Sequence, residues 1–337
     1  MQRSLFLLAF VALSIIGCNS GGATTDNNAA PSTNTAGGGS ADKKLRIAFI
    51  PKGSTHEFWK AMQAGAEEAA KANNVELFWK GPEKEDDKAD QIKTVESFTS
   101  QGVDGIILAP LDADALKTPS KEAMAKGIKM IIVDSDLKGA DTESFIATDN
   151  ELAGKMGGER LVKALGGKGK VIMLRYAEGS ASTEAREKGF LAAAKAGGLE
   201  VVSENQHGGA TRETAQTASE SLLQTVKSGD GLSIQGIFCP NESTAFGMMK
   251  ALQNAKLMGK VKFVGFDSSK ELLDGVASGD IEGLVLQNPA NMGKLGVENM
   301  VKVLKGGKID KRIDTGATLV DKANLDSPEV KALLGKK

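Results

Sequence analysis

The feature that most constrains this chain is a repeated alternation of short apolar runs with longer amphipathic stretches, beginning near Lys43. In the first half, the apolar runs are 45–50, 77–79, 105–109 and 130–133, and helical spacing marks 57–73, 88–101 and 114–126. Continuous apolar runs are typical of parallel strands that helices cover on both faces. The alternation therefore predicts an α/β layer fold with right-handed crossovers.

The same alternation restarts in the second half of the chain. Strands are predicted at 171–174, 200–203, 237–239, 263–266 and 281–286, and helices at 150–165, 183–196, 213–227, 242–253 and 291–304. Two sets of about five strands with no linker-rich break between them predict two similar lobes. A ligand would then bind at the carboxyl ends of the strands, between the lobes.

The first residues have the layout of an export signal. Arg3 precedes an apolar run at 5–16, which is shorter than the roughly 20 residues of a membrane span, and Gly17 and Cys18 follow. The segment 15–18 resembles a bacterial lipobox, which implies that 1–18 is a lipoprotein signal peptide and that Cys18 becomes lipidated. An ordinary signal peptide with an incidental cysteine is the alternative.

Composition limits the remaining possibilities. Residues 19–42 are mostly Gly, Ser, Thr, Asn and Ala, which predicts a disordered tether between a membrane anchor and the fold. The formal net charge of −1 gives no basic field for nucleic acid. Cys239 has no partner for an internal disulfide and is expected to be buried, while His56 and His207 lie apart, so no metal or cofactor is expected.

Polar side chains collect where the apolar strands end, and two aromatic residues follow the first strand. These candidate ligand residues are Lys52, Phe58, Trp59, Asp134, Arg186, Asn241, Asp267 and Gln287. Aromatic rings can stack on the C–H faces of a sugar, while carboxylate, amide and guanidinium groups can bridge neighbouring hydroxyls. Strand-end Asp and Asn also cap helices, which is the structural alternative for each.

Several segments together carry a family resemblance. They are Pro-Lys-Gly-Ser-Thr-His-Glu-Phe-Trp at 51–59, Gln-Gly-Val-Asp-Gly-Ile-Ile-Leu-Ala-Pro at 101–110, Ile-Ala-Thr-Asp-Asn at 146–150, Arg-Glu-Lys-Gly-Phe at 186–190, Pro-Asn-Glu at 240–242, Val-Gly-Phe-Asp at 264–267 and Gln-Asn-Pro at 287–289. In order and spacing the chain resembles the periplasmic ribose-binding branch of the type I substrate-binding proteins, from about 45 to 320.

The resemblance implies a fold and a function. The fold would be two Rossmann-like, doubly wound lobes, 43–149 plus 288–315 and 150–287 plus 316–337, joined by a hinge with crossings near Asp149, Asn288 and Thr315. The chain would bind a monosaccharide, a pentose such as ribose or a related sugar, and deliver it to the permease of an ABC importer. It would be a monomer without catalytic activity, in the periplasm or at the cell surface, held to the membrane only by its lipid.

The resemblance also assigns the sugar contacts residue by residue. They would be Phe58, Trp59, Asp134, Arg186, Asn241, Asp267 and Gln287, with Phe266 packing nearby. Two departures leave ribose itself open: Ser135 stands where the ribose binder has a second arginine, and Lys52 adds a cation on the other wall.

Other classes remain as alternatives. The closed lobes could serve a sensor or chemoreceptor instead of a transporter, and the ligand could be a polyol or a nucleoside. An effector domain of a transcriptional regulator would need a helix-turn-helix where the lipobox and tether stand. A glycosidase would need Asp134 and Asp267 as its carboxylate pair, but a nearby Arg186 would keep both ionised, which does not suit a general acid.

Overall fold

The computed structural model describes residues 44–335. The predicted signal peptide, Cys18 and the 19–42 tether lie outside these residues. Among the described residues, no helix has the length and apolar character that crossing a membrane requires. Two six-stranded sheets form the centres of two lobes, which confirms the predicted α/β fold class.

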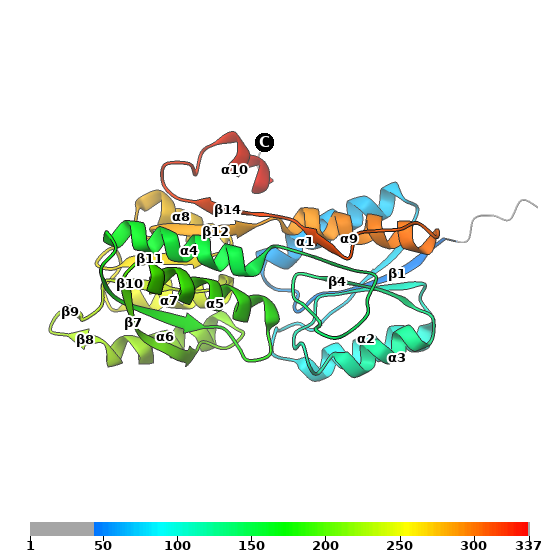
Figure 1. Cartoon of the computed structure of the whole chain (residues 1–337), viewed down its shortest axis with the longest axis horizontal. Coiled ribbons are helices and arrows are strands. Elements are labelled where there is room, and N and C mark those ends of the chain that lie inside the picture. The colour runs from blue at the N-terminus through cyan, green and yellow to red at the C-terminus, as the bar shows by residue number, and fades with distance from the viewer. Residues whose placement is uncertain (1–43, 336–337) are drawn as a thin grey trace, which may run out of the picture. The chain divides into compact units, whose positions relative to one another are not determined.

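The N-terminal lobe is built on a parallel sheet in the order β13-β5-β4-β3-β1-β2. Its strands are β1 (Arg46–Ile50), β2 (Glu76–Trp79), β3 (Gly105–Leu108), β4 (Lys129–Val133), β5 (Ser144–Ala147) and β13 (Arg312–Asp314). Its helices are α1 (Glu57–Ala72), α2 (Lys88–Gln101), α3 (Lys117–Ala125) and α9 (Pro289–Leu304). Helices α1 and α9 lie together over one face of the sheet, and α2 and α3 lie over the other (Figure 1).

Alternate residues of each strand enter different cores. Phe49 and Ile107 pack towards α1 and α9, whereas Ile50 and Leu108 pack towards α2 and α3, and all four are fully buried. Burial on both faces explains why these strands are continuous apolar runs in the sequence.

The C-terminal lobe repeats this plan with the sheet order β14-β12-β11-β10-β6-β7, in which β14 alone is antiparallel to its neighbour. Its strands are β6 (Gly169–Arg175), β7 (Leu199–His207), β10 (Gly236–Phe238), β11 (Lys262–Phe266), β12 (Gly283–Gln287) and β14 (Ala317–Val320), with a small hairpin of β8 (Lys227–Ser228) and β9 (Gly231–Leu232). Its helices are α4 (Asn150–Leu165), α5 (Ala181–Ala196), α6 (Arg212–Thr225), α7 (Glu242–Asn254), α8 (Lys270–Ser278) and α10 (Pro328–Leu333). Cys239 is fully buried in the core under α7, as predicted.

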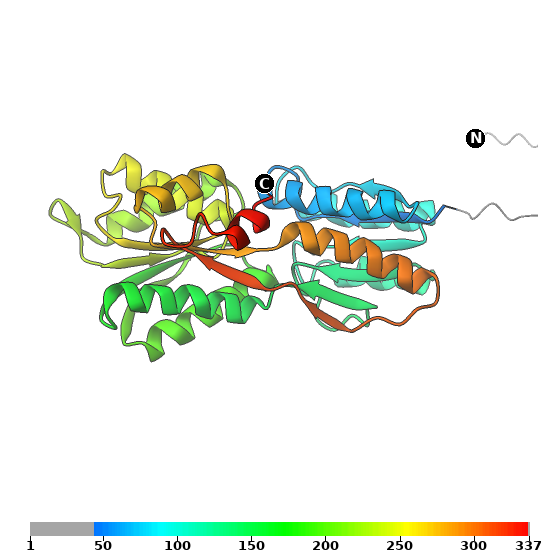
Figure 2. The ribbon, with the colours of Figure 1, turned by 90° about the horizontal axis from the view of Figure 1, so that it is seen from above.

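The described chain passes between the two lobes three times. The passes lie between β5 and α4, between β12 and α9, and between β13 and β14 (Figure 2). Each lobe is therefore assembled from segments that are distant in sequence, which confirms the predicted three-crossing hinge.

The structure contains elements that the hydrophobic pattern did not predict. Strands β5, β13 and β14 are three or four residues long, and β13 lies at a sheet edge with two of its three residues exposed, so it forms no apolar run. Helix α3 begins at Lys117 instead of Asp114, because the Asp112 side chain accepts the backbone N–H groups of Asp114 and Ala115 and holds a turn there.

Candidate ligand-binding site

A cavity lies between the lobes, where strands of both sheets end. All of the predicted ligand residues except Phe266 line it, and six further residues join them: His56, Glu85, Tyr176, Ser182, Thr183 and Glu242. The topology explains this convergence, because the carboxyl ends of parallel strands lie at one edge of each sheet. The structure therefore brings residues from seven separate stretches of sequence to one place. Whether they contact a ligand stays a prediction.

Two carboxylates enter the cavity from equivalent positions in the two lobes. Asp134 directly follows β4 and Asp267 directly follows β11, and both have left-handed backbones, with φ of 61° and 65°. Each donates its backbone N–H to the next strand of its sheet, Asp134 to Ile146 and Asp267 to Val285. Asp tolerates this region better than most residues, and the turn aims the side chain away from the sheet.

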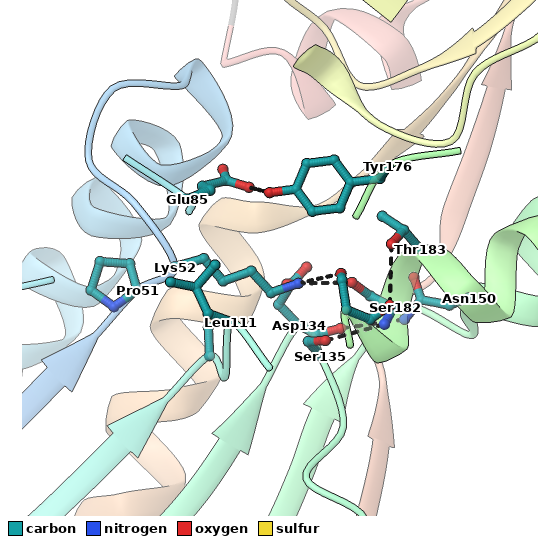
Figure 3. Close-up of polar contacts among 12 residues, drawn as sticks. Pro51, Lys52, Glu85, Leu111, Asp134, Ser135, Asn150, Tyr176, Ser182 and Thr183 are labelled. Atoms are coloured by element: carbon teal, nitrogen blue, oxygen red, sulfur yellow. Dashed lines mark hydrogen bonds and ion pairs between the residues drawn. The ribbon is translucent and has the colours of Figure 1, made fainter. Parts of the chain in front are cut away.

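Lys52 joins the two walls of the cavity. Its Nζ lies 3.4 Å from Asp134 Oδ2 within the N-terminal lobe, and it donates to Ser180 Oγ at 3.1 Å and Ser182 Oγ at 3.0 Å in the C-terminal lobe (Figure 3). Lys52 is 3% exposed, so its ammonium is held by polar partners instead of water. The Ser182 backbone N–H also donates to Ser135 Oγ across the same gap.

Arg186 is fixed by neighbours on all sides. Its Nε donates to Asn150 Oδ1 at 2.9 Å, its Nη1 donates to the Pro240 carbonyl at 3.0 Å, and its guanidinium stacks 4.7 Å from the centre of the Phe266 ring. Phe266 thus supports Arg186 from behind and does not line the cavity. One nitrogen, Nη2, lies 3.9 Å from Asp134 Oδ1, so Arg186 faces the carboxylate of the opposite lobe.

The backbone of Arg186 is positioned by close helix packing. A Cβ added at Gly154 in α4 would lie 1.9 Å from the Arg186 carbonyl oxygen in α5. Only glycine fits such an approach. The position of the guanidinium therefore depends on a residue that has no side chain.

Asp267 is the most deeply engaged carboxylate of the C-terminal lobe. Its Oδ2 accepts the Glu242 backbone N–H at 3.0 Å, and its Oδ1 accepts Gln287 Nε2 at 2.9 Å. Burial raises the pKa of Asp267 to about 6, although Arg186 and the Gln287 hydrogen bond oppose the shift. The carboxylate is ionised at neutral pH, and each of its oxygens has a lone pair left for a further donor.

A third buried carboxylate, Glu85, organises another side of the cavity. It accepts hydrogen bonds from Trp59 Nε1 at 2.5 Å and His56 Nδ1 at 2.8 Å, both in its own lobe, and from the Tyr176 hydroxyl of the C-terminal lobe at 2.6 Å (Figure 3). Burial by itself would raise the pKa of Glu85, but the charge of His56 and the three hydrogen bonds lower it to about 2. Burial by itself would lower the pKa of His56, but Glu85 outweighs it and raises that pKa to about 9.

Trp59 is both a core residue and part of the cavity wall. Its ring is 3% exposed and belongs to the core under α1, and it also borders the cavity, edge-on to Phe58 at 4.8 Å between ring centres. The Glu85 hydrogen bond fixes the indole plane. Asn241 also takes part in two features of the structure at once: its side chain caps α7 by accepting the Thr244 N–H at 3.3 Å, and it lines the cavity.

The cavity is tightly closed in this arrangement. Little space remains among its walls, since only about 30 Å³ is open to the centres of water-sized molecules. Because Lys52 and Tyr176 both bond across the gap, a larger molecule can enter only when the lobes part. Closure of such lobes is a hinge motion, and the three passes between them are where it can occur.

Comparison with known proteins decides the family. A periplasmic binding protein domain matches residues 47–308, which is most of the chain. The chain belongs to the periplasmic binding protein family. Membership agrees with the resemblance drawn from the sequence, and it places the chain among substrate-binding proteins of the periplasm.

Several proteins that are similar to this chain are named as sugar-binding proteins or were solved with a sugar. The D-allose-binding periplasmic protein of Escherichia coli K12 is 30% identical over 278 residues, covering 80% of this chain and 88% of that protein. A carbohydrate transporter solute-binding protein of Agrobacterium radiobacter, solved with D-arabinose, superimposes with a TM-score of 0.81 at 32% identity, covering 87% and 99% of the two chains. A solute-binding protein of Agrobacterium vitis, solved with D-fucose, gives a TM-score of 0.80 at 34% identity, covering 85% and 98%.

Proposed function

We propose that this chain binds a neutral monosaccharide between its lobes and delivers it to an ABC importer. The observation that carries the proposal is the convergence of Asp134, Arg186 and Asp267 with two aromatic rings in one interlobe cavity. Relatives that are named for D-allose, ribose and D-arabinose binding support the sugar class.

The charges of the site favour a neutral ligand. Each carboxylate faces a cation: Asp134 faces Lys52, Glu85 faces His56, and Asp267 lies in the field of Arg186. A charged ligand would have to enter a dry site without a free counterion, which is costly. Hydroxyl groups can instead donate to the remaining lone pairs of the carboxylates and accept from the guanidinium.

The remaining parts of the proposal concern the whole protein. Residues 43–149 plus 288–315 and 150–287 plus 316–337 act as the two closing lobes. Cys18 carries a lipid that tethers the protein to a membrane, and the protein acts as a monomer that faces the permease. The bound sugar leaves unchanged, because the site binds it without catalysing a reaction.

A ligand screen tests the proposal. The full chain, purified from a bacterial envelope, is heated with D-allose, D-ribose, D-arabinose, other hexoses, pentitols, inositols and nucleosides. A ligand at 100 times its dissociation constant stabilises the fold by roughly 2.7 kcal/mol, which is a shift of several degrees. A shift with one or two monosaccharides is expected. A shift only with nucleosides, or with no compound at all, would contradict it.

A further inference from the structure

Two acceptor oxygens at one end of the cavity have no donor among the residues that the structure describes. Glu242 is the first residue of α7, and it is 2% exposed. Its Oε1 accepts Arg212 Nη2 at 2.5 Å, whereas its Oε2 is buried and has no hydrogen-bond partner among residues 44–335. Gln287 is 5% exposed, and its Oε1 is likewise unpartnered within that range.

Both free oxygens flank Asp267, which the proposed function treats as a sugar contact. The Glu242 backbone and the Gln287 side-chain amide donate to the two different oxygens of that carboxylate. An ionised carboxylate can only accept, so the nitrogen of Gln287 must face Asp267 and its oxygen must be the free atom. Glu242, Asp267 and Gln287 all line the cavity, so the free oxygens border the space that a ligand would fill.

The free oxygen of Glu242 is a strong acceptor without an unbalanced charge beside it. Arg212 neutralises the carboxylate through Oε1, and its guanidinium is itself held 4.1 Å from the centre of the Phe246 ring. A purely structural role for Glu242, as the partner of Arg212 or as an acidic residue at the start of α7, needs only Oε1. Such a role does not explain why Oε2 is buried, and buried polar atoms in native proteins are seldom unpaired.

We infer that Glu242 is a specificity-determining residue whose Oε2, with Gln287 Oε1 beside it, accepts hydrogen bonds from a hydroxyl group of the bound sugar. The inference rests on the proposed function and extends it. The ligand must offer a donor at this ring position, so a sugar with hydrogen or a ketone oxygen there is rejected. The expected discrimination is roughly 5- to 150-fold in affinity, which corresponds to one buried acceptor left unpaired.

Calorimetric titration with D-allose and D-ribose tests the residue. In Glu242→Gln the side chain keeps its shape and its acceptor for Arg212 but presents an NH₂ donor to the cavity, and affinity for the better sugar should fall at least about tenfold. Glu282→Gln is the matched control. Glu282 is also arginine-paired, with Arg160 at 2.6 Å, and mostly enclosed, but neither residue lines the cavity, so affinity should stay unchanged.

Deoxy sugars separate a ligand contact from a structural effect. The unaltered protein should reject one singly deoxygenated derivative of the better sugar, and Glu242→Gln should bind that derivative as well as it binds the parent. If Glu242→Gln does not fold, Glu242→Asp keeps the charge, withdraws the oxygen by one methylene and is measured in the same way. Equal affinities of variant and unaltered protein, or equal deoxy penalties in both, would overturn the inference alone. An unaltered protein that binds no sugar would overturn the proposed function as well.

Discussion

The ion pair of His56 and Glu85 predicts how the stability of this protein depends on pH. The unfolded chain has the ordinary histidine pKa of 6.5, and the folded protein raises it to about 9. A raised pKa means that the contribution of His56 is fully present below pH 6.5 and is lost as the pH rises through about 9. Glu85, with its pKa lowered to about 2, stays ionised throughout that window.

The size of the effect follows from the pKa difference. Each pH unit inside the window corresponds to about 1.4 kcal/mol, so the free energy of unfolding should fall by about 2 kcal/mol between pH 6.5 and pH 8.5. The shifts of His56 and Glu85 describe one interaction and are counted once. In Glu85→Gln the histidine loses its counter-charge and remains buried, so this part of the pH dependence should disappear.

Denaturant unfolding at the two pH values, for both proteins, measures the difference. Glu57→Gln is the control, because Glu57 adjoins His56 in sequence but is exposed and pairs with Lys60 at 2.8 Å; its profile should match that of the unaltered protein. The comparison cancels every other titrating group. If Glu85→Gln lost as much stability between pH 6.5 and 8.5 as the unaltered protein, the paired histidine would not be the cause and the reasoning would be refuted.

Three further predictions concern binding and location. Asp267→Ala should weaken binding of the preferred sugar by about 1–3 kcal/mol in a titration, because hydroxyl groups of the ligand lose their acceptor, and an unchanged affinity would remove Asp267 from the site. Gly154→Ala should push α4 from α5, lowering stability by about 1–3 kcal/mol in denaturant unfolding and also weakening binding, whereas a stability loss with intact affinity would show that Arg186 does not depend on this packing. Cys18→Ser should move the protein from the membrane to the soluble fraction of cells, and continued pelleting with membranes would contradict the lipid anchor.

Much of the fold could be predicted because local signals agree with the tertiary structure. Helix α4 was predicted at its observed bounds: the Asp149 side chain caps its first turn, and Gly166 ends it in a left-handed conformation with φ of 63°. Where side chains override the periodic pattern, the prediction failed, as at the start of α3. The edge strands β13 and β14 form through pairing with distant strands, which the local pattern of three or four residues does not encode.

The site was predictable only in part, for a related reason. Residues at strand ends, such as Asp134 and Asp267, can be predicted from the sequence, because the topology alone carries them to the cavity. Glu85 lies in a polar segment after β2 with several other charged residues, and nothing in that segment distinguishes the one carboxylate that is buried. Tyr176 directly follows β6, and Glu242 begins α7 shortly after β10, so the topology carries both to the cavity as well. A signal does exist for Tyr176, since it is the single tyrosine of the chain and follows a buried strand.

The interleaving of the lobes has a consequence for how the chain acquires its structure. Helix α1 ends at Ala72, but α9, which covers the same face of the sheet, does not begin until Pro289. A growing chain that has reached the end of β12 therefore still exposes the part of one apolar face that α9 will cover. Contacts of such long sequence separation form slowly. The protein should remain unfolded or loosely collapsed until its last segments are available. An export route that requires unfolded chains, or a chaperone, could use this state. Truncation before α9 would make it permanent.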